Sequence, residues 1–366
     1  MTPLAELTTF GIGGPATTLL QPSTRDELVE QTLGTWGSPE DWLILGGGSN
    51  VVIADEGFDG VVVRVATRGM SATRVEGSAR PVRLTVEAGE PWDAVVAHTV
   101  ANGWSGIEAL SGIPGSAGAA PVQNIGAYGQ ELSSSLVSID FLDFDSGRVV
   151  RIPAPELGLG YRTSALKRGR LGLVVALELA LGDETSLSQP IAYAQLANAL
   201  NVRIGDRVPV AELRVAVLEL RAAKGMLWDP EHPDPDSASA GSFFTNPVVS
   251  ENFARGLPAD APRWPTAPEE AARVLPLGSD IPRIVRGEYL VKLSAAWLIE
   301  HAGITRGFAL PGSRAAISSK HTLAIVNRGG ATAADVVQLA GYIQTRVLAE
   351  FGVSLQPEPV LVGVQL

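Results

Sequence analysis

Short apolar runs bounded by turn residues are spaced along the first half of the chain, a pattern typical of β-strands. The runs that predict strands are Trp42–Leu45, Val51–Ile53, Val61–Val65, Val82–Val86, Val137–Phe144 and Leu173–Leu179. Because segments with helical spacing lie between and after these runs, the pattern predicts a mixed α and β protein. Its N-terminal part should be the richer in strands.

Four segments carry the apolar spacing of an amphipathic helix. They begin at Thr24, Pro91, Ala211 and Thr332, and the last three end near Gly103, Gly225 and Gly352. The first should start with a capping box between Thr24 and Glu27. Leu28, Val29 and Leu33 would then form its apolar face.

Two proline-rich stretches interrupt this order of elements. Residues 229–236 alternate proline with acidic residues and histidine, which neither a helix nor a central strand accommodates. We therefore place a domain boundary near this stretch. A second irregular stretch covers residues 256–280.

The composition excludes several classes of function. The 366-residue chain has no cysteine, so disulfides, thiolate nucleophiles and cysteine-ligated metal sites are excluded. A net charge of −11 argues against a nucleic-acid partner, although a few local cations can still bind a small anion. The chain's four histidines show no metal-ligand spacing, so we expect no metal and assign no role to His301 or His321.

No targeting or membrane signal is visible. The N-terminus lacks a basic region followed by an apolar core. The longest apolar run, Leu171–Leu181, contains Glu178 and is shorter than the ~18 residues of a membrane span. We expect a cytoplasmic protein with no membrane partner.

The 40 glycines exceed the average usage of about 7%, and they gather in loops. Residues 11–16 match a dinucleotide fingerprint formally, but a strand-like segment follows where a Rossmann site needs a helix, so we reject that interpretation. Gly46–Asn50 lies between two predicted strands, where successive glycine N–H groups could hold a phosphate. A plain β-hairpin turn is the competing interpretation, and this motif alone favours it.

A long run of small residues, Gly112–Gly129, shifts the balance towards a ligand site. Small residues let the backbone approach a ligand closely and offer its N–H groups as donors. A flexible linker fits poorly, because Ile113, Pro114, Val122 and Ile125 would anchor the run.

Seven motifs, taken in order, resemble those of the UDP-N-acetylenolpyruvoylglucosamine reductases, flavoenzymes that complete UDP-N-acetylmuramic acid for peptidoglycan. The motifs are Phe10–Gly14, Leu45–Asn50, Ile113–Gly115, Gln123–Gly129, Gly160–Arg162, Gly241–Pro247 and Leu355–Glu358. The resemblance runs from about Leu7 to Val362. The form of the Gln123 loop and the segment around Tyr193 are similar to the longer, type I form of the family.

This resemblance implies an α+β fold, with a vanillyl-alcohol-oxidase-like (PCMH-type) FAD-binding part of two subdomains and a C-terminal α+β substrate-binding domain. The first subdomain would cover residues 1–70, with a C-terminal strand at 355–366 returning to it. The second would cover residues 71–224, and the substrate-binding domain residues 225–354. In that fold the flavin pyrophosphate lies on glycine loops without a Rossmann helix, in agreement with the strand–loop–strand pattern.

The resemblance also implies cofactors and a reaction. NADPH would reduce bound FAD, and hydride would pass from flavin N5 to the enolpyruvyl C3 of UDP-N-acetylglucosamine enolpyruvate, before C2 is protonated. Ala119 and Ala120 stand where some relatives have serines, so hydroxyl contacts to the flavin would be absent there. The expected FAD-binding residues are Gly46, Gly47, Gly48, Ser49, Asn50, Ile113, Pro114, Gly115, Ser116, Gln123, Asn124, Ile125, Gly126, Ala127 and Tyr128.

Three residues match the catalytic positions of the family. Arg162 would hold the enolpyruvyl carboxylate and stay charged as negative charge develops. Ser242 would protonate C2, and Glu358 would assist at the carboxylate, for which it needs a raised pKa. From the residues alone, a surface arginine and a turn serine are the favoured interpretations, and an edge-strand glutamate is a fair competitor.

Five further residues match substrate-contacting positions: Tyr161, Tyr193, Arg221, Lys224 and Asn246. Tyr193 falls where the longer form has a loop that closes over the UDP diphosphate. Lys224 follows Arg221 by one helical turn and could share its face. A solvated helix end for Lys224 and a turn for Asn246 are the alternatives. We expect a monomer whose small positive site contains Arg162 and Lys224.

Two other functions stay open. One is an FAD-dependent oxidase of an alcohol or sugar with the same fold, and the other is a nucleotide-sugar-binding protein without catalysis. Bleaching of a yellow protein by NADPH without oxygen favours the reductase, whereas a chain that takes up no flavin favours the binding protein.

Overall fold

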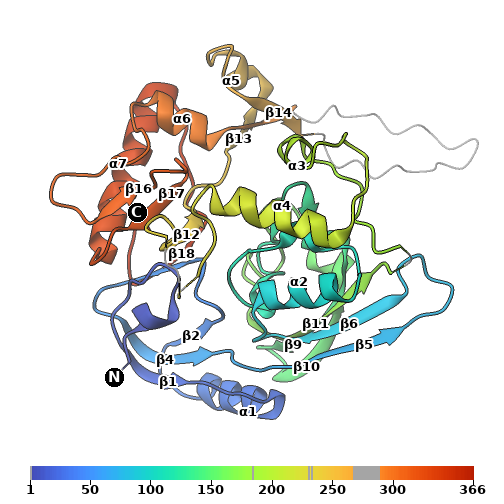
Figure 1. The fold of residues 1–366 in the computed structure, drawn as a ribbon. Helices are drawn as coiled ribbons and strands as arrows, with labels where there is room; N and C mark the ends of the chain where they lie inside the picture. Colours follow the sequence, from blue (N-terminus) through green and yellow to red (C-terminus); the bar gives the residue numbers. More distant parts are fainter. Residues whose placement is uncertain (1, 184, 230, 232–233, 267–288) are drawn as a thin grey trace, which may run out of the picture.

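The computed structural model describes residues 2–183, 185–229, 231, 234–266 and 289–366. Three groups of elements follow one another along the chain (Figure 1). Short 3-10 helices cover Leu4–Leu7, Glu108–Leu110, Ala117–Ala119, Leu132–Ser134 and Ala154–Leu157.

The N-terminal group is a parallel sheet with the order β1–β4–β2, formed by Ala16–Leu20, Phe58–Arg64 and Trp42–Leu45. Helix α1 (Arg25–Trp36) begins with the predicted capping box at Thr24. The predicted apolar face of α1 is only partly buried: Leu28 is fully buried, whereas Leu33 is 36% exposed.

Strand β3 (Val51–Ile53) leaves this sheet and pairs in parallel with β18 (Val360–Val362). The residues between β2 and β3 therefore do not form a β-hairpin turn, so that interpretation of Gly46–Asn50 is wrong. Strand β18 brings the end of the chain beside the glycine loop, where the Val360 N–H donates to the Asn50 carbonyl at 2.9 Å.

The middle group is a five-stranded antiparallel sheet with the order β10–β9–β11–β6–β5. In that order the strands cover Arg148–Pro153, Leu136–Asp143, Gly172–Leu181, Val82–Glu87 and Met70–Arg74. Helices α2 (Trp92–Ala101) and α4 (Val210–Ala222) lie over the sheet in Figure 1, with α3 (Ala194–Ala199) beyond them. A short hairpin joins β7 (Gly126–Ala127) to β8 (Gln130–Glu131).

The C-terminal group contains two small antiparallel sheets and three helices. One sheet has the order β12–β17–β16 and the other β13–β15–β14. Their strands cover Ser239–Ser242, Ala324–Asn327 and Ala315–Ile317, and then Val248–Ser250, Leu290–Leu293 and Arg263–Thr266; the helices are α5 (Glu251–Arg255), α6 (Ala295–His301) and α7 (Ala333–Phe351). Strand β14 lies in the stretch that was expected to be irregular, and residues 267–280 of that stretch lie outside the described residues.

Helix α7 fixes the C-terminal group to the N-terminal one. It begins with a capping box at Thr332 and Asp335 and ends at the left-handed Gly352, as predicted. Its first two N–H groups donate to both carboxylate oxygens of Asp55, at 2.8 and 3.2 Å. Phe10, Ile12 and Val52 pack in the same hydrophobic cluster as the buried face of α7. The proposed domain limits therefore do not separate the cores completely.

Among the described residues, none of the helices combines the length and the apolar character needed to cross a bilayer.

Candidate active site

A cavity of about 320 Å³ lies where the three groups meet, within the size range of small-molecule sites. Its walls come from distant parts of the sequence. The predicted site residues that line it are Gly46–Asn50, Ile113–Ser116, Gln123, Ile125, Gly126, Arg162, Arg221, Ser242 and Glu358. Two adjoining cavities, of about 200 and 570 Å³, share Gly46 and Ser116 with it.

The two glycine loops pack directly on each other at this cavity. A Cβ atom on Gly47 would lie 2.6 Å from the Cα of Gly115, which is too close for any side chain. The Ser49 hydroxyl donates to the Pro114 carbonyl at 3.0 Å and so joins the loops. The glycines of the two loops that line the cavity therefore serve the close approach of backbone to backbone.

Gly47→Ala is expected to weaken FAD binding by up to about a hundredfold. Overpacking of this kind costs about 1–3 kcal/mol, which separation of the two loops would relieve. Titration of the flavin-free protein with FAD measures the effect. Gly34→Ala in α1 is the control, because nothing lies within 4 Å of its added Cβ. Equal affinities of the two variants would contradict the prediction.

Ser116 supplies a polar atom that fits an anionic ligand. Its hydroxyl is buried, and no described residue hydrogen-bonds to it. It lines all three adjoining cavities. Because a buried hydroxyl without a partner is costly, a bound group with acceptor oxygens would satisfy it. Together with the N–H groups of the glycine loops, this donor set suits the pyrophosphate of FAD.

Asn50 joins the glycine loop to two other walls. Its Nδ2 donates to Gln123 Oε1 and to the Glu358 carbonyl, each at 3.3 Å. These contacts fix the positions of the Gln123 loop and of the C-terminal segment relative to the glycine loop.

Arg162 and Glu358 lie in contact in the cavity wall. Arg162 Nε lies 3.2 Å from Glu358 Oε1, and Arg162 Nη2 donates to the Gly126 carbonyl at 3.0 Å. Arg162 has a φ of 52°, which is uncommon for a residue other than glycine. Such strained backbone conformations are often found at functional sites. Burial raises the pKa of Glu358, against the opposing charges of Arg162 and Lys167. Glu358 therefore keeps its proton to a higher pH than an ordinary glutamate.

Ser242 is brought beside Glu358 by backbone pairing. The segment after Ser242 runs antiparallel to the segment before β18, since the Glu358 N–H donates to the Phe243 carbonyl at 2.9 Å. Gly241, with a φ of 75°, turns the chain just before Ser242. Phe243 and Phe244 are both buried and anchor this segment in the C-terminal core. Both Ser242 and Glu358 line the cavity.

Tyr161, Asn246 and Lys292 form a group beyond the cavity wall. Asn246 Nδ2 donates to the Tyr161 hydroxyl at 3.4 Å, and its Oδ1 accepts from the first N–H of α6 at 2.9 Å. Lys292 Nζ lies 4.7 Å from the centre of the Tyr161 ring. The Tyr161 side chain is 43% exposed, so this group faces solvent beside the site.

Tyr193 and Lys224 form a second such group around Tyr128. The rings of Tyr128 and Tyr193 meet edge to face at 5.9 Å, and Lys224 Nζ lies 5.5 Å from the Tyr128 ring centre. Lys224 also donates to Gln195 Oε1 at 3.0 Å. Burial, and secondarily Arg221, lowers the pKa of Lys224.

Arg221 and Lys224 have different partners, although the charge of Arg221 is close enough to lower the pKa of Lys224. Helix α4 ends at Ala222, so Lys224 lies in the following turn. Arg221 is 6% exposed and donates from Nε to the Gly112 carbonyl at 3.0 Å. The described cations that line the cavity are Arg162, Lys167 and Arg221, so Arg221 takes the place expected for Lys224.

Asn124, Ala127 and Tyr128 lie beside the cavity and do not line it within the described residues. Asn124 holds local backbone instead: its Nδ2 donates to the Gly160 carbonyl at 3.2 Å, and its Oδ1 accepts from Ser133 N–H at 2.9 Å. It thereby connects the Gln123 loop to the turn that carries Arg162.

Two lysines were missed by sequence reasoning. Lys167 lines the cavity, although its place among neighbouring basic residues favoured a surface role. Lys292 is a single charge in the apolar strand β15, a signal that could have marked it. In the described part of the chain, no three His, Asp or Glu residues are grouped as metal ligands.

Comparisons with known proteins cover both halves of the chain. The family described as "UDP-N-acetylenolpyruvoylglucosamine reductase, C-terminal domain" matches residues 233–362, and the family "FAD binding domain" matches residues 17–153. A UDP-N-acetylenolpyruvoylglucosamine reductase of Leifsonia xyli is 60% identical, over 99% of this chain and 98% of its own length. Another, of Saccharopolyspora erythraea, is 49% identical over 99% of this chain and 95% of its own.

A solved structure agrees with these matches. The UDP-N-acetylenolpyruvylglucosamine reductase of Thermus caldophilus superposes with a TM-score of 0.63 at 25% identity, over 99% of this chain and 97% of that one. Together with the FAD-binding match, this likeness confirms the fold class expected from the sequence.

Proposed function

The chain belongs to the UDP-N-acetylenolpyruvoylglucosamine reductase family, and from this premise we propose that it reduces UDP-N-acetylglucosamine enolpyruvate to UDP-N-acetylmuramate for peptidoglycan synthesis. FAD is the bound cofactor and NADPH the hydride donor. The observation that carries this proposal is the cavity in which Arg162, Ser242 and Glu358 meet the two glycine loops.

Different residues of the cavity wall would bind the cofactor and the substrate. The N–H groups of Gly46–Asn50 and the Ser116 hydroxyl would hold the flavin pyrophosphate. When bound and reduced, FAD supplies the hydride that enters at the enolpyruvyl C3. Arg162 would hold the substrate carboxylate and stabilise the negative charge that develops on it and on C2.

The proton for C2 would come from the Ser242 hydroxyl, which solvent then reprotonates. Serine is a poor acid by itself, so neighbouring positive charge must favour the transfer. Glu358 in its neutral form would donate a hydrogen bond to the substrate carboxylate, which an ionised carboxylate could not do. Its raised pKa supports this role.

Tyr161, Tyr193, Lys224 and Asn246 would bind the UDP part of the substrate, and Lys292 would join them because it lies against Tyr161. Lys224 and Lys292 would supply charge to the diphosphate. Gln123 and Asn124 would hold the flavin-binding loops in place through their hydrogen bonds to Asn50 and to the Gly160 carbonyl. From the sequence pattern we further expect a monomer in the cytoplasm with no nucleic-acid partner, which sedimentation and cell fractionation would check.

Anaerobic half-reactions test the proposed function. NADPH should bleach the oxidised flavin absorbance, and UDP-N-acetylglucosamine enolpyruvate should then restore it with UDP-N-acetylmuramate as product. Bleaching without restoration would contradict the proposed substrate. Restoration by oxygen alone, with turnover of an alcohol or sugar, would instead identify an oxidase. A chain that takes up no FAD would be a binding protein.

A further inference from the structure

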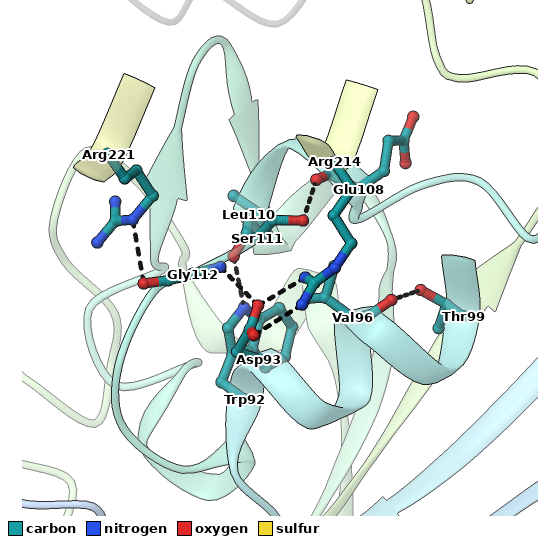
Figure 2. A network of polar contacts seen from close by, with 10 residues as sticks. All are labelled: Trp92, Asp93, Val96, Thr99, Glu108, Leu110, Ser111, Gly112, Arg214 and Arg221. Carbon is teal, nitrogen blue, oxygen red and sulfur yellow. Dashed lines mark hydrogen bonds and ion pairs between the residues drawn. The ribbon is translucent and has the colours of Figure 1, made fainter. Parts of the chain in front are cut away.

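Two helices hold the loop at residues 110–115 from opposite sides, as Figure 2 shows. Trp92, the first residue of α2, donates from its backbone N–H to the Gly115 carbonyl at 2.9 Å and from its indole to the Leu110 carbonyl at 3.2 Å. Asp93, the next residue, accepts the Gly112 N–H at 2.6 Å. From α4, Arg221 holds the carbonyl of the same Gly112 at 3.0 Å. Both peptide groups of Gly112 are therefore fixed.

Gly112 occupies a position where a side chain would be both strained and crowded. Its φ is 70°, and an added Cβ would lie 2.6 Å from Leu227 Cδ2 and 2.9 Å from Leu218 Cδ2. Helix α4 thus packs against the Gly112 backbone itself. The residues that follow it, Ile113–Ser116, line the cavity proposed to hold FAD.

Arg214 holds Asp93 in place. Its Nη1 and Nη2 donate to the two carboxylate oxygens at 2.6 and 2.8 Å, the bidentate geometry that fixes a carboxylate most strongly. Arg214, Leu218 and Arg221 follow at helical spacing on one face of α4, so the same face positions Asp93 and Gly112. The side chain of Arg214 is 16% exposed and that of Asp93 40%.

The electrostatics around Asp93 favour its charged carboxylate form. Burial opposes ionisation of Asp93, but Arg214, the Gly112 N–H and Arg221 together hold its pKa below the ordinary value. Asp93 in turn helps the almost fully buried Arg221 to remain charged against desolvation. Arg221 lines the main cavity, whereas Asp93 lines the adjoining cavity of about 570 Å³ together with Gly112–Ser116.

We propose that Asp93 is a positioning residue for flavin binding: held by Arg214, it fixes the Gly112 N–H so that Ile113–Ser116 is preformed to receive FAD. The inference rests on the proposed function, because it takes residues 113–116 as part of the flavin site. The competing explanation is an ion pair that merely stabilises the packing of α2 on α4.

The test is the affinity of full-length flavin-free protein for FAD, measured by flavin fluorescence well below each variant's melting temperature. Asp93→Ala should bind FAD about ten- to a hundredfold more weakly, the effect of losing one hydrogen bond to a charged group in the binding-competent loop. Asp93→Asn should recover much of this loss, since its amide oxygen can still accept the Gly112 N–H. The double variant Asp93→Ala with Arg214→Ala should bind within about threefold of Asp93→Ala alone, as expected for residues that act as a unit.

A second ion pair provides the matched control. Arg151 and Glu178 lie 2.7 Å apart in the five-stranded sheet, away from the cavity. Glu178→Gln should change FAD affinity by less than twofold.

Three results would overturn the inference: wild-type affinity in Asp93→Ala, an equal loss in Glu178→Gln, or no recovery in Asp93→Asn. Hydrogen exchange of the Gly112 N–H in flavin-free protein is a measurement independent of FAD affinity, and this exchange should become faster in Asp93→Ala. A wild-type chain that binds no FAD would instead contradict the proposed function, and with it the flavin-binding role of Asp93. Wild-type FAD binding combined with an unaffected Asp93→Ala contradicts the inference alone.

Discussion

Ser242→Ala is expected to slow the reoxidation of reduced flavin by the enolpyruvyl substrate by about 10²- to 10⁴-fold, the usual contribution of a general acid. Reduction of the flavin by NADPH should stay near the wild-type rate, because no proton is delivered to carbon in that step. The side chain loses only its hydroxyl, so the cavity keeps its shape. Stopped-flow measurement of each half-reaction separates the two rates.

The position of Ser242 supports this separation. It ends strand β12 in the cavity wall, and the paired backbone of Phe243 and Glu358 fixes it beside the proposed carboxylate site. No described side chain accepts or donates a hydrogen bond at its hydroxyl, which leaves that group available to the substrate.

Ser239→Ala is the matched control for this experiment. Ser239 lies three residues earlier in the same strand, and its hydroxyl accepts the Gly241 N–H at 3.2 Å. Its loss should leave both half-reactions within a few-fold of wild type. If Ser242→Ala slowed flavin reduction and reoxidation equally, Ser242 would not be the proton donor.

Glu358→Ala is expected to slow the same reoxidation step by about ten- to a hundredfold. Removal of one hydrogen bond to a charged group costs about 1.5–3 kcal/mol, and here that group is the developing substrate carboxylate. Glu358→Gln should retain part of the rate, because an amide N–H can still donate. Flavin reduction by NADPH serves as the internal control in both variants.

The pH dependence of the flavin reoxidation rate should differ between the wild-type protein and Glu358→Gln. Burial raises its pKa, and the neutral acid is the form that donates. As the pH rises through this raised pKa, the wild-type reoxidation rate should therefore fall. The rate of Glu358→Gln should lack this fall, and a fall of the same size in both proteins would assign the titration to another group.

The same raised pKa makes a prediction about stability. The folded chain holds the Glu358 proton more tightly than the unfolded chain, so this group contributes stability that is fully present below the ordinary glutamate pKa. The contribution is lost as the pH rises through the folded-state value. The free energy of unfolding of Glu358→Gln, relative to wild type, should therefore increase with pH in urea titrations. A difference that did not change with pH would show that Glu358 has an ordinary pKa.

Local patterns in the sequence predicted elements whose formation is itself local. The capping boxes at Thr24 and Thr332 mark the starts of α1 and α7, because each threonine hydroxyl accepts the N–H group three residues later without help from the rest of the chain. The apolar runs at β2, β3, β6, β9 and β11 likewise marked strands, and all of these except β2 are buried on at least one face. The strand after residue 15 was reason enough to reject a Rossmann site, and β1 lies there.

The meeting of the site residues was not visible in these patterns. The sequence alone left a hairpin turn as the favoured interpretation of Gly46–Asn50, because periodicity does not reveal that β3 pairs with β18, some three hundred residues away. Only the packing of Gly47 on Gly115 explains why a side chain is excluded there. The family resemblance pointed to Arg162, Ser242 and Glu358, whereas their positions along the chain offered no reason to group them.

The sequence by itself determined the elements, the glycine loops and the chemistry available, since these depend on residue type and on neighbours within a few positions. The tertiary structure decided which charges enter the cavity. Arg221 is buried against Gly112 and Lys224 is turned to Gln195 because helix α4 ends between them. It also decided the raised pKa of Glu358, since desolvation depends on atoms that long-range folding brings around the carboxyl group.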